Sequence, residues 1–312
     1  GLPLMIASGL TDFLRDAVDL QVQVDAIGLG AIFALMAVGI GLVFGVMRLV
    51  NFAYGQLIMA GAFAIAFASD RDWPVGVGIA LCFAVVLALS LAMERVVFRP
   101  LRGQSAAVML IATFAVAFLL QSIALLWFGP LGKTASSLVQ LNRPVEIGGL
   151  DVRKITIVSI VTAAVCLLLL VALLNRTSIG LHMRAAAIDS QTARLLGVRA
   201  NLVSTVSVLI AGALAAVVAV MLTVQFPTVT PTFALQETIL VLAGVVVGGM
   251  SRLLSATLGG FLIGYVSGLL GGALPSAQSQ YLPSLIFGLV ILVLLVRPDG
   301  LFTRGRGLVE RV

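Results

Sequence analysis

The sequence predicts an all-α polytopic membrane protein with about nine transmembrane helices, its N-terminus outside the cell and its C-terminus inside. Hydrophobic residues make up 61% of the 312 residues and charged residues only 10%, whereas a soluble domain has about 25% charged residues. Apolar runs recur at about the 20-residue length that a helix needs to cross the hydrocarbon core. The basic residues gather in alternate connections between these runs, which sets the orientation.

Nine apolar segments are predicted to form the spans. They cover residues 26–47, 50–69, 75–97, 105–128, 154–174, 202–224, 235–250, 253–272 and 280–296. The seventh segment is short and the second begins with the polar Asn51, so either of them could be broken or partly re-entrant. A single transmembrane domain over residues 26–296 accounts for most of the chain, with no soluble catalytic domain attached.

The two ends of the chain differ in charge. Residues 1–25 contain four aspartates against one arginine, which is the wrong charge for the basic start of a signal peptide. The distribution of basic residues described next puts this N-terminal segment outside the cell. Residues 297–312 form a short basic tail, which is expected at the lipid headgroups on the cytoplasmic side.

The basic residues give the orientation of the spans. With nine crossings and an external N-terminus, thirteen of the 19 lysines and arginines fall on the inner side. All thirteen are arginines: Arg48, Arg95, Arg99, Arg102, Arg176, Arg184, Arg194, Arg199, Arg252, Arg297, Arg304, Arg306 and Arg311. The opposite orientation would require these thirteen to be translocated, against the excess of positive charge that cytoplasmic loops carry.

The segment 180–197 is a long polar interruption between spans that also has helical periodicity. Apolar and small residues recur on one face at three- and four-residue spacing, while charged residues fall elsewhere. The face comprises Leu181, Ala185, Ile188, Thr192, Leu195 and Leu196. The pattern predicts a cytoplasmic amphipathic helix over about 181–196, which lies either against a protein partner or flat at the lipid headgroups.

Polar residues inside the predicted spans are few. Asn51, Tyr54 and Gln56 cluster at the start of the second span, and Gln236 and Glu237 open the seventh. Ionisable residues are absent from the middle of every predicted span. A proton-driven carrier usually needs such residues at depth, so the pattern argues against one.

Glycines recur every four residues along the eighth span, at Gly260, Gly264, Gly268 and Gly272. A face of this kind lets two membrane helices approach closely, either within the chain or against a partner chain, and packing within the chain is the simpler interpretation.

Other kinds of chemistry are excluded by the sequence. His182 is the only histidine and has no acidic or thiol neighbour that would make a triad or a metal site. The segment Gly129–Thr134 has two residues rather than four between its glycines, so it is not a phosphate-binding loop. The formal charge of +6 comes without interleaved aromatic residues and predicts no nucleic-acid partner.

Four segments together resemble one family, the permease subunits of bacterial ABC importers for branched-chain amino acids and their urea and amide relatives. They are residues 28–61, with the sequence NFAYG near their end, and residues 180–198, 245–264 and 294–312. The segments lie in the family's order and extend through nearly the whole chain. The length resembles that of the shorter, LivH-like permease of these systems.

The resemblance implies a non-catalytic membrane subunit of the bacterial inner membrane that works with several partners. These would be a second, distinct and longer permease, two ATPase subunits that hold ATP and Mg²⁺, an external substrate-binding protein and membrane lipid. This chain itself would bind no cofactor. Its coupling to the ATPases would use Arg184, Ala185, Asp189, Arg194, Leu195, Leu196 and Gly197.

The same resemblance implies a pathway between the two permeases, with Asn51, Tyr54 and Gln56 as candidate lining residues. Two positions depart from the family pattern. Tyr54 stands where a histidine is common, and Ser251-Arg252-Leu253-Leu254 replaces a more usual turn. The first departure leaves the solute open among branched-chain amino acids, urea and amides. The alternative function is a secondary transporter or small-solute channel that acts without ATPases.

Overall fold

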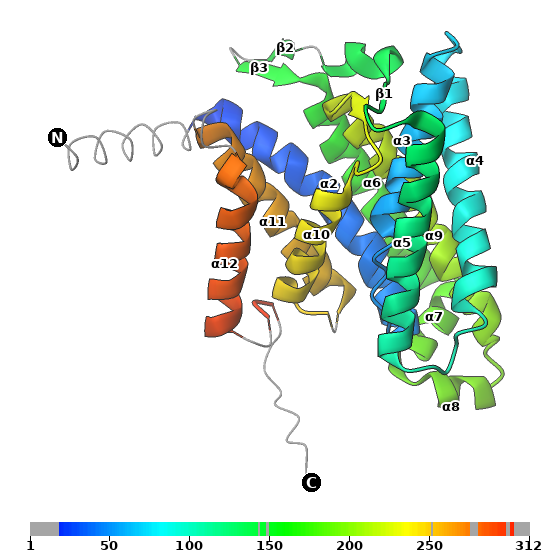
Figure 1. Ribbon diagram of the computed structural model, residues 1–312. Helices are drawn as coiled ribbons and strands as arrows, with labels where there is room; N and C mark the ends of the chain where they lie inside the picture. Colours follow the sequence, from blue (N-terminus) through cyan, green and yellow to red (C-terminus); the bar gives the residue numbers. More distant parts are fainter. Residues whose placement is uncertain are drawn as a thin grey trace.

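The computed structural model describes residues 19–142, 144–147, 150–250, 252–274, 280–297 and 300–302. Most of the predicted external segment 1–25 and most of the predicted tail 297–312 lie outside the described residues. Long helices packed side by side form the body of the molecule, and short strands cap one end of it (Figure 1). The prediction of an all-α polytopic membrane protein is confirmed.

Eleven α-helices lie within the described residues. They are α2 (Leu20–Met47), α3 (Tyr54–Ser69), α4 (Val75–Met93), α5 (Ala106–Phe128), α6 (Lys154–Arg176), α7 (Ser178–Ile188), α8 (Ser190–Leu195), α9 (Ala200–Gln225), α10 (Leu235–Gly248), α11 (Leu253–Ala273) and α12 (Leu282–Val296). A π-helical turn, η1 (Glu94–Phe98), continues α4. Six of the nine predicted spans are long and apolar enough to cross a membrane. They lie on α2, α4 with η1, α5, α6, α9 and α11. The other three lie on the shorter helices α3, α10 and α12.

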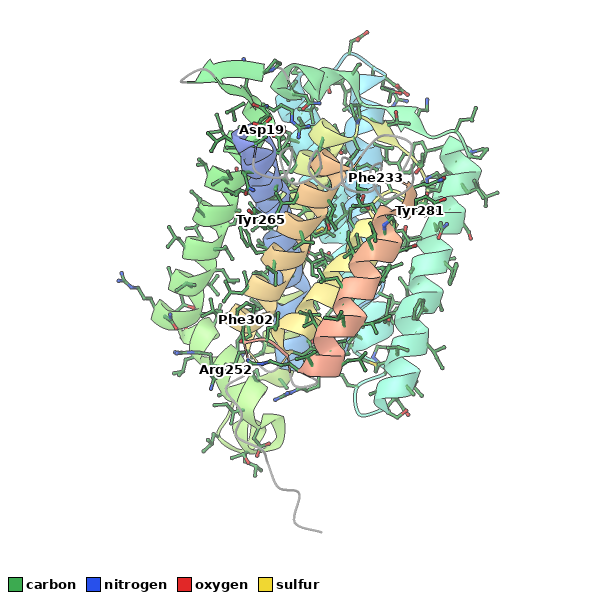
Figure 2. The ribbon with its side chains drawn as sticks, turned by 90° about the vertical axis from the view of Figure 1, so that its left-hand side faces the viewer. Asp19, Phe233, Arg252, Tyr265, Tyr281 and Phe302 are labelled. Carbon is green, nitrogen blue, oxygen red and sulfur yellow. The ribbon has the colours of Figure 1, made fainter. Side chains whose placement is uncertain are left out.

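The two ends of the molecule differ in structure. At one end, β1 (Lys133–Thr134) pairs with β4 (Thr228–Val229), and β2 (Pro144–Ile147) pairs with β3 (Leu150–Arg153), both antiparallel. We call this the strand end. The helices α7 and α8 lie at the opposite end, which we call the α7/α8 end (Figure 1). Asp19 lies toward the strand end, whereas Arg252 and Phe302 lie toward the other (Figure 2).

The core is built around α2, in which every residue from 30 to 43 is buried. The glycines of α11 face α2: a Cβ added to Gly264 would lie 2.7 Å from the Cβ of Phe33, and one added to Gly268 would lie 2.5 Å from the Cα of Ala26. The predicted glycine face therefore packs within the chain, and that interpretation is confirmed. α4, α5 and α6 are much less buried: only 17 to 22% of the residues in the most apolar stretch of each helix are buried.

We expect Gly264→Ala to destabilise the protein by about 1–3 kcal/mol, because the added methyl group would push α11 away from α2 along a closely packed face. The Cβ would also lie 2.9 Å from the Cα of Gly30, so no flexible side chain can yield to it. The measurement is the midpoint of thermal unfolding of the purified protein in mild detergent. The matched control is Gly288→Ala on α12, where an added Cβ meets no atom within 4 Å. Equal midpoints for the two variants would contradict the packing argument.

Candidate functional site

The first candidate site is the segment that joins α2 to α3. α2 ends at Met47, and Arg48 then adopts a left-handed conformation with φ 54°. The side-chain oxygen of Asn51 accepts a hydrogen bond of 3.0 Å from the backbone N–H of Ala53. This turn satisfies a backbone donor at the start of α3 and sets the direction in which the helix leaves.

The three candidate pathway residues lie inside the chain. Asn51, Tyr54 and Gln56 are 3%, 1% and 1% exposed. The structure brings them together at the start of α3, on the inside of the bundle. α4, α9 and α10 pack on α3, and the ring of Tyr54 lies against Gly39 of α2. That these residues line a pathway between two permeases stays a prediction.

Two of these side chains hold polar atoms without a hydrogen-bond partner in the described part of the chain. They are the hydroxyl of Tyr54 and both amide atoms of Gln56. A buried polar group left unpaired costs about 1–3 kcal/mol. Polar groups retained at membrane depth at such a cost usually mark the route of a polar solute.

The start of α3 meets the start of α10, and we call this contact the junction (Tyr54–Leu57 with Ala234–Thr238). Gly55 makes the close approach possible: a Cβ there would overlap the hydroxyl of Thr238 and lie 3.0 Å from the carbonyl oxygen of Ala234. The ring of Tyr54 fills the space beside Gly39 in the same way, since a Cβ on Gly39 would overlap its hydroxyl.

The two helices of the junction run to opposite ends of the molecule. α3 ends at Ser69, whose hydroxyl is 3.0 Å from that of Ser136 at the strand end. α10 ends at Gly248, which packs on the first turns of α11, so it runs through the middle and lower part of the bundle (Figure 1). With 16 and 14 residues, the helices are about 24 and 21 Å long. Two helices shorter than the roughly 30 Å hydrocarbon core thus begin next to each other inside the bundle, and the positive ends of their dipoles converge there.

A small cavity lies beside the first turn of α10. Its volume is about 190 Å³. Its lining combines apolar residues with hydroxyl, amide and carboxyl groups: Leu222, Phe226, Thr230, Thr232, Phe233, Ala234, Gln236 and Glu237. Sequence reasoning noted Gln236 and Glu237 but missed Gly55, Ala234 and Thr238, because a contact between segments 180 residues apart leaves no local pattern.

The second candidate site is the outward surface of α7 and α8. Thr177 caps α7 by accepting a 3.0 Å hydrogen bond from the N–H of Gly180. Met183 and Ala186 are buried against the bundle. The face that the periodicity singled out points the other way. Leu181, Ile188, Leu195 and Leu196 are 58%, 86%, 87% and 80% exposed.

The single helix expected over 181–196 is wrong in one respect: the structure divides it at Asp189. That residue is extended (φ −147°, ψ 106°), and its carboxylate accepts hydrogen bonds from the N–H of Thr192 at 3.2 Å and from the Thr192 hydroxyl. Asp189 therefore caps the N-terminus of α8. At the other end Gly197, with φ +88°, lets the N–H of Val198 donate to the carbonyl of Ala193 at 3.0 Å, as in a Schellman motif.

The remaining candidate coupling residues surround this break. Ala185 is half-buried, and Arg184 is exposed with its guanidinium donating to the side-chain oxygen of Asn175 at 3.4 Å. The side chain of Arg194 lies outside the described part of the structure. We call the surface formed by the exposed side chains of Leu181, Ile188, Leu195 and Leu196 the α7/α8 face.

A buried ion pair lies between η1 and the start of α9. The Glu94 carboxylate is 2.5 Å from the guanidinium of Arg102, with side-chain exposures of 2% and 18%. Arg102 also donates to the side-chain oxygen of Asn201, so it ties η1 to the start of α9. The π-helical turn at Glu94 accommodates this arrangement; such turns are rare and often mark functional positions.

We expect Arg102→Ala to destabilise the protein by about 3–5 kcal/mol, because it leaves the buried Glu94 carboxylate without its partner. Replacing both residues with leucine should cost much less, since no buried charge then remains. Thermal unfolding of the purified variants is the measurement. The control is Arg95→Ala, which removes an exposed arginine from the same turn and should change the unfolding midpoint little. An equally small effect of Arg102→Ala would show that the ion pair does not contribute to stability.

The chain is similar to known membrane transport proteins over nearly its whole length. The family described as the permease component of branched-chain amino acid transport systems matches residues 23–295. The chain is 30% identical over 305 residues to BraD of Pseudomonas aeruginosa, a permease protein of a high-affinity branched-chain amino acid transport system, with 94% of this chain and 98% of that protein covered. It is 28% identical to the permease protein LivH of Escherichia coli, with 94% and 97% covered.

A solved structure shares the fold. It is a chain of PsaBC from Streptococcus pneumoniae in complex with Fab, with a TM-score of 0.51 and 12% sequence identity. The similarity covers 93% of this chain and 97% of that chain.

Proposed function

This chain belongs to the family of permease components of branched-chain amino acid transport systems, and from that membership we propose how it works. It is a multi-pass subunit of the bacterial inner membrane. It forms half of the translocation pathway of an ATP-driven importer for branched-chain amino acids or related small polar solutes. ATP and Mg²⁺ belong to partner ATPase subunits, and this chain is non-catalytic.

The observation that carries the proposal is the exposed apolar face of α7 and α8. A pair of neighbouring leucines more than three-quarters exposed, on a helix capped at both ends, is typical of a surface that inserts into a groove. In the importer this groove belongs to an ATPase subunit. Arg184 and Arg194 would then offer charge-assisted hydrogen bonds to the rim of this groove.

The proposed orientation puts the strand end outside and the α7/α8 end in the cytoplasm, with nine crossings. Support comes from the charges at each end. The strand end holds carboxylates that pair with its few basic residues: Asp70 with Lys133 and Asp25 with Arg153. The other end holds mainly arginines, in agreement with the excess of positive charge in cytoplasmic loops.

The junction is the proposed position at which the pathway opens and closes within each chain. Asn51, Tyr54 and Gln56 would supply polar contacts to the solute, and the dipoles of α3 and α10 would favour its carboxylate. The absence of a compensating partner for Gln56 in the described residues supports a role in transient contacts. Separation of α3 from α10 would open the route.

The importer would also contain a second, longer permease, two ATPases, an external binding protein and bound lipid. A secondary transporter or channel is not favoured, because the relatives are permease proteins of transport systems and because neither alternative needs a cytoplasmic docking face.

The experiment that tests the proposal is purification of the tagged chain from its native membrane in mild detergent, with mass spectrometry of the proteins that accompany it. We expect two ATPase copies and a second, longer permease in the complex. A homo-oligomer without any ATPase would overturn the proposal and place a channel or secondary transporter first.

A further inference from the structure

Arg48 joins the two candidate sites. Its backbone caps the C-terminus of α2, with its N–H donating to the carbonyl of Phe44 at 2.8 Å. Its guanidinium donates to the carbonyl oxygen of Ala187, in the last turn of α7, at 2.9 Å. A single residue thus contacts the proposed docking helix while it begins the segment that leads to Asn51 and α3.

The backbone of Arg48 is strained. A left-handed conformation costs an ordinary residue about 1–2 kcal/mol relative to the right-handed one, and glycine is the usual residue at this position after a helix. The arginine side chain therefore compensates for a conformational cost that glycine would avoid. Its contact explains how: the positive charge lies at the negative end of the α7 dipole and satisfies a carbonyl that the helix leaves unpaired.

The packing around this contact leaves room for movement. Arg48 lines two cavities, of about 150 and 320 Å³. The first is bounded by residues of α6, α7 and α11, including Leu174, Met183 and Leu253. The second is bounded by residues of α5, α7 and α9, including Met109 and Val203. Because a close-packed interior resists displacement, hollow space on both flanks allows α7 to shift while the hydrogen bond to Arg48 is kept.

The segment beyond Arg48 is anchored to neighbouring helices. The carbonyl of Val50 accepts a hydrogen bond from the Thr113 hydroxyl at 3.4 Å, and Phe52 stacks on Phe114 with ring centroids 4.1 Å apart. Two residues farther on, Tyr54 enters the junction. A displacement of Arg48 is thus conveyed over few residues to the start of α3 rather than lost in a flexible loop.

We propose that Arg48 is the positioning residue that transmits movement of α7 to the junction, so that ATPase closure at the α7/α8 face separates α3 from α10. This inference rests on the proposed importer function. The left-handed backbone acts as the hinge, and the bond to the Ala187 carbonyl is the link that turns it. Loss of the guanidinium would leave the ATPases bound but disconnected from the pathway.

The test uses the complete complex in proteoliposomes, with leucine as the solute, and compares Arg48→Ala, Arg48→Gly and Arg48→Lys with the unmodified chain. The readouts are ATPase co-purification, ATP hydrolysis and leucine uptake per ATP hydrolysed. We expect Arg48→Ala to keep the ATPases while uptake per ATP falls by about 5- to 150-fold, the range of typical coupling energies. Arg48→Lys, which keeps a donor and the charge, should recover part of this loss.

Arg48→Gly distinguishes loss of the hydrogen bond to Ala187 from a loss of stability, because glycine relieves the backbone strain yet lacks the guanidinium. It should be at least as stable as Arg48→Ala and equally uncoupled. The control is Arg99→Ala, which removes an exposed arginine at the same end. Unchanged uptake per ATP in Arg48→Gly would overturn the inference, as would a parallel fall of uptake and hydrolysis at constant ratio. If the unmodified chain retains no ATPase, the importer proposal itself fails.

Discussion

Replacing Leu195 and Leu196 with aspartate is expected to abolish co-purification of the ATPases while the chain remains in the membrane. Both side chains are at least 80% exposed, so the substitutions remove no packing from the fold. In the complex each leucine would be buried in the partner. Truncation of a central interface residue costs about 2 kcal/mol or more, and two such losses weaken binding by about a thousandfold. Burial of the new carboxylates adds to the loss.

The measurement is the amount of ATPase recovered with equal amounts of tagged permease, alongside membrane fractionation to verify insertion. The matched control is Leu131→Asp, which changes a leucine that is 89% exposed near the strand end. It should leave ATPase recovery unchanged. ATPase binding that survives the double substitution would show that α8 does not dock, and loss of binding only in the control would reverse the proposed orientation.

Gly55→Ala is expected to lower leucine uptake at least tenfold without loss of the ATPases. The added methyl group would meet the hydroxyl of Thr238 and the carbonyl of Ala234, and overpacking of this kind costs about 1–3 kcal/mol. The added methyl group would destabilise the conformation in which α3 contacts α10 and would leave the conformation in which they are separated unaffected. The equilibrium between the two conformations, which transport requires, would therefore shift. Uptake by reconstituted complexes is the measurement.

The rescue experiment distinguishes a blocked junction from general damage. Thr238→Ala removes the hydroxyl that the new methyl group would overlap, so the pair of substitutions should recover uptake that Gly55→Ala alone loses. Gly45→Ala on α2, where an added Cβ meets no atom within 4 Å, should behave like the unmodified chain. A Gly55→Ala chain that transports normally would place the pathway elsewhere.

Periodicity and length predicted the features that depend on neighbours in sequence. The spans on α2, α5, α9 and α11, the glycine face of α11 and the outward leucines of α7 and α8 all follow from local patterns. These patterns survive folding because the bilayer imposes the same apolar length on each span and because a helix repeats every 3.6 residues.

Features that depend on distant segments were not predictable in this way. The junction requires Gly55 and Thr238 to meet, the ion pair requires Glu94 to turn back toward Arg102, and the link requires Arg48 to reach Ala187. The division of the predicted helix at Asp189 was not predicted for a different reason. An aspartate in the middle of an amphipathic pattern can continue the helix or cap a new one, and the backbone resolves this choice only when the side chain finds Thr192.

The caps of α8 have a consequence for how tightly the importer holds together. A six-residue helix would not persist by itself in water, yet Asp189 closes its first turn and Gly197 its last. The leucines are therefore presented on a surface whose backbone is already ordered, at a saving of about 1–2 kcal/mol for each residue that would otherwise lose its freedom on binding. In the proposed complex Asp189 and Gly197 thus act through entropy, as preorganising residues, and the affinity for the ATPase is set partly before the two proteins meet.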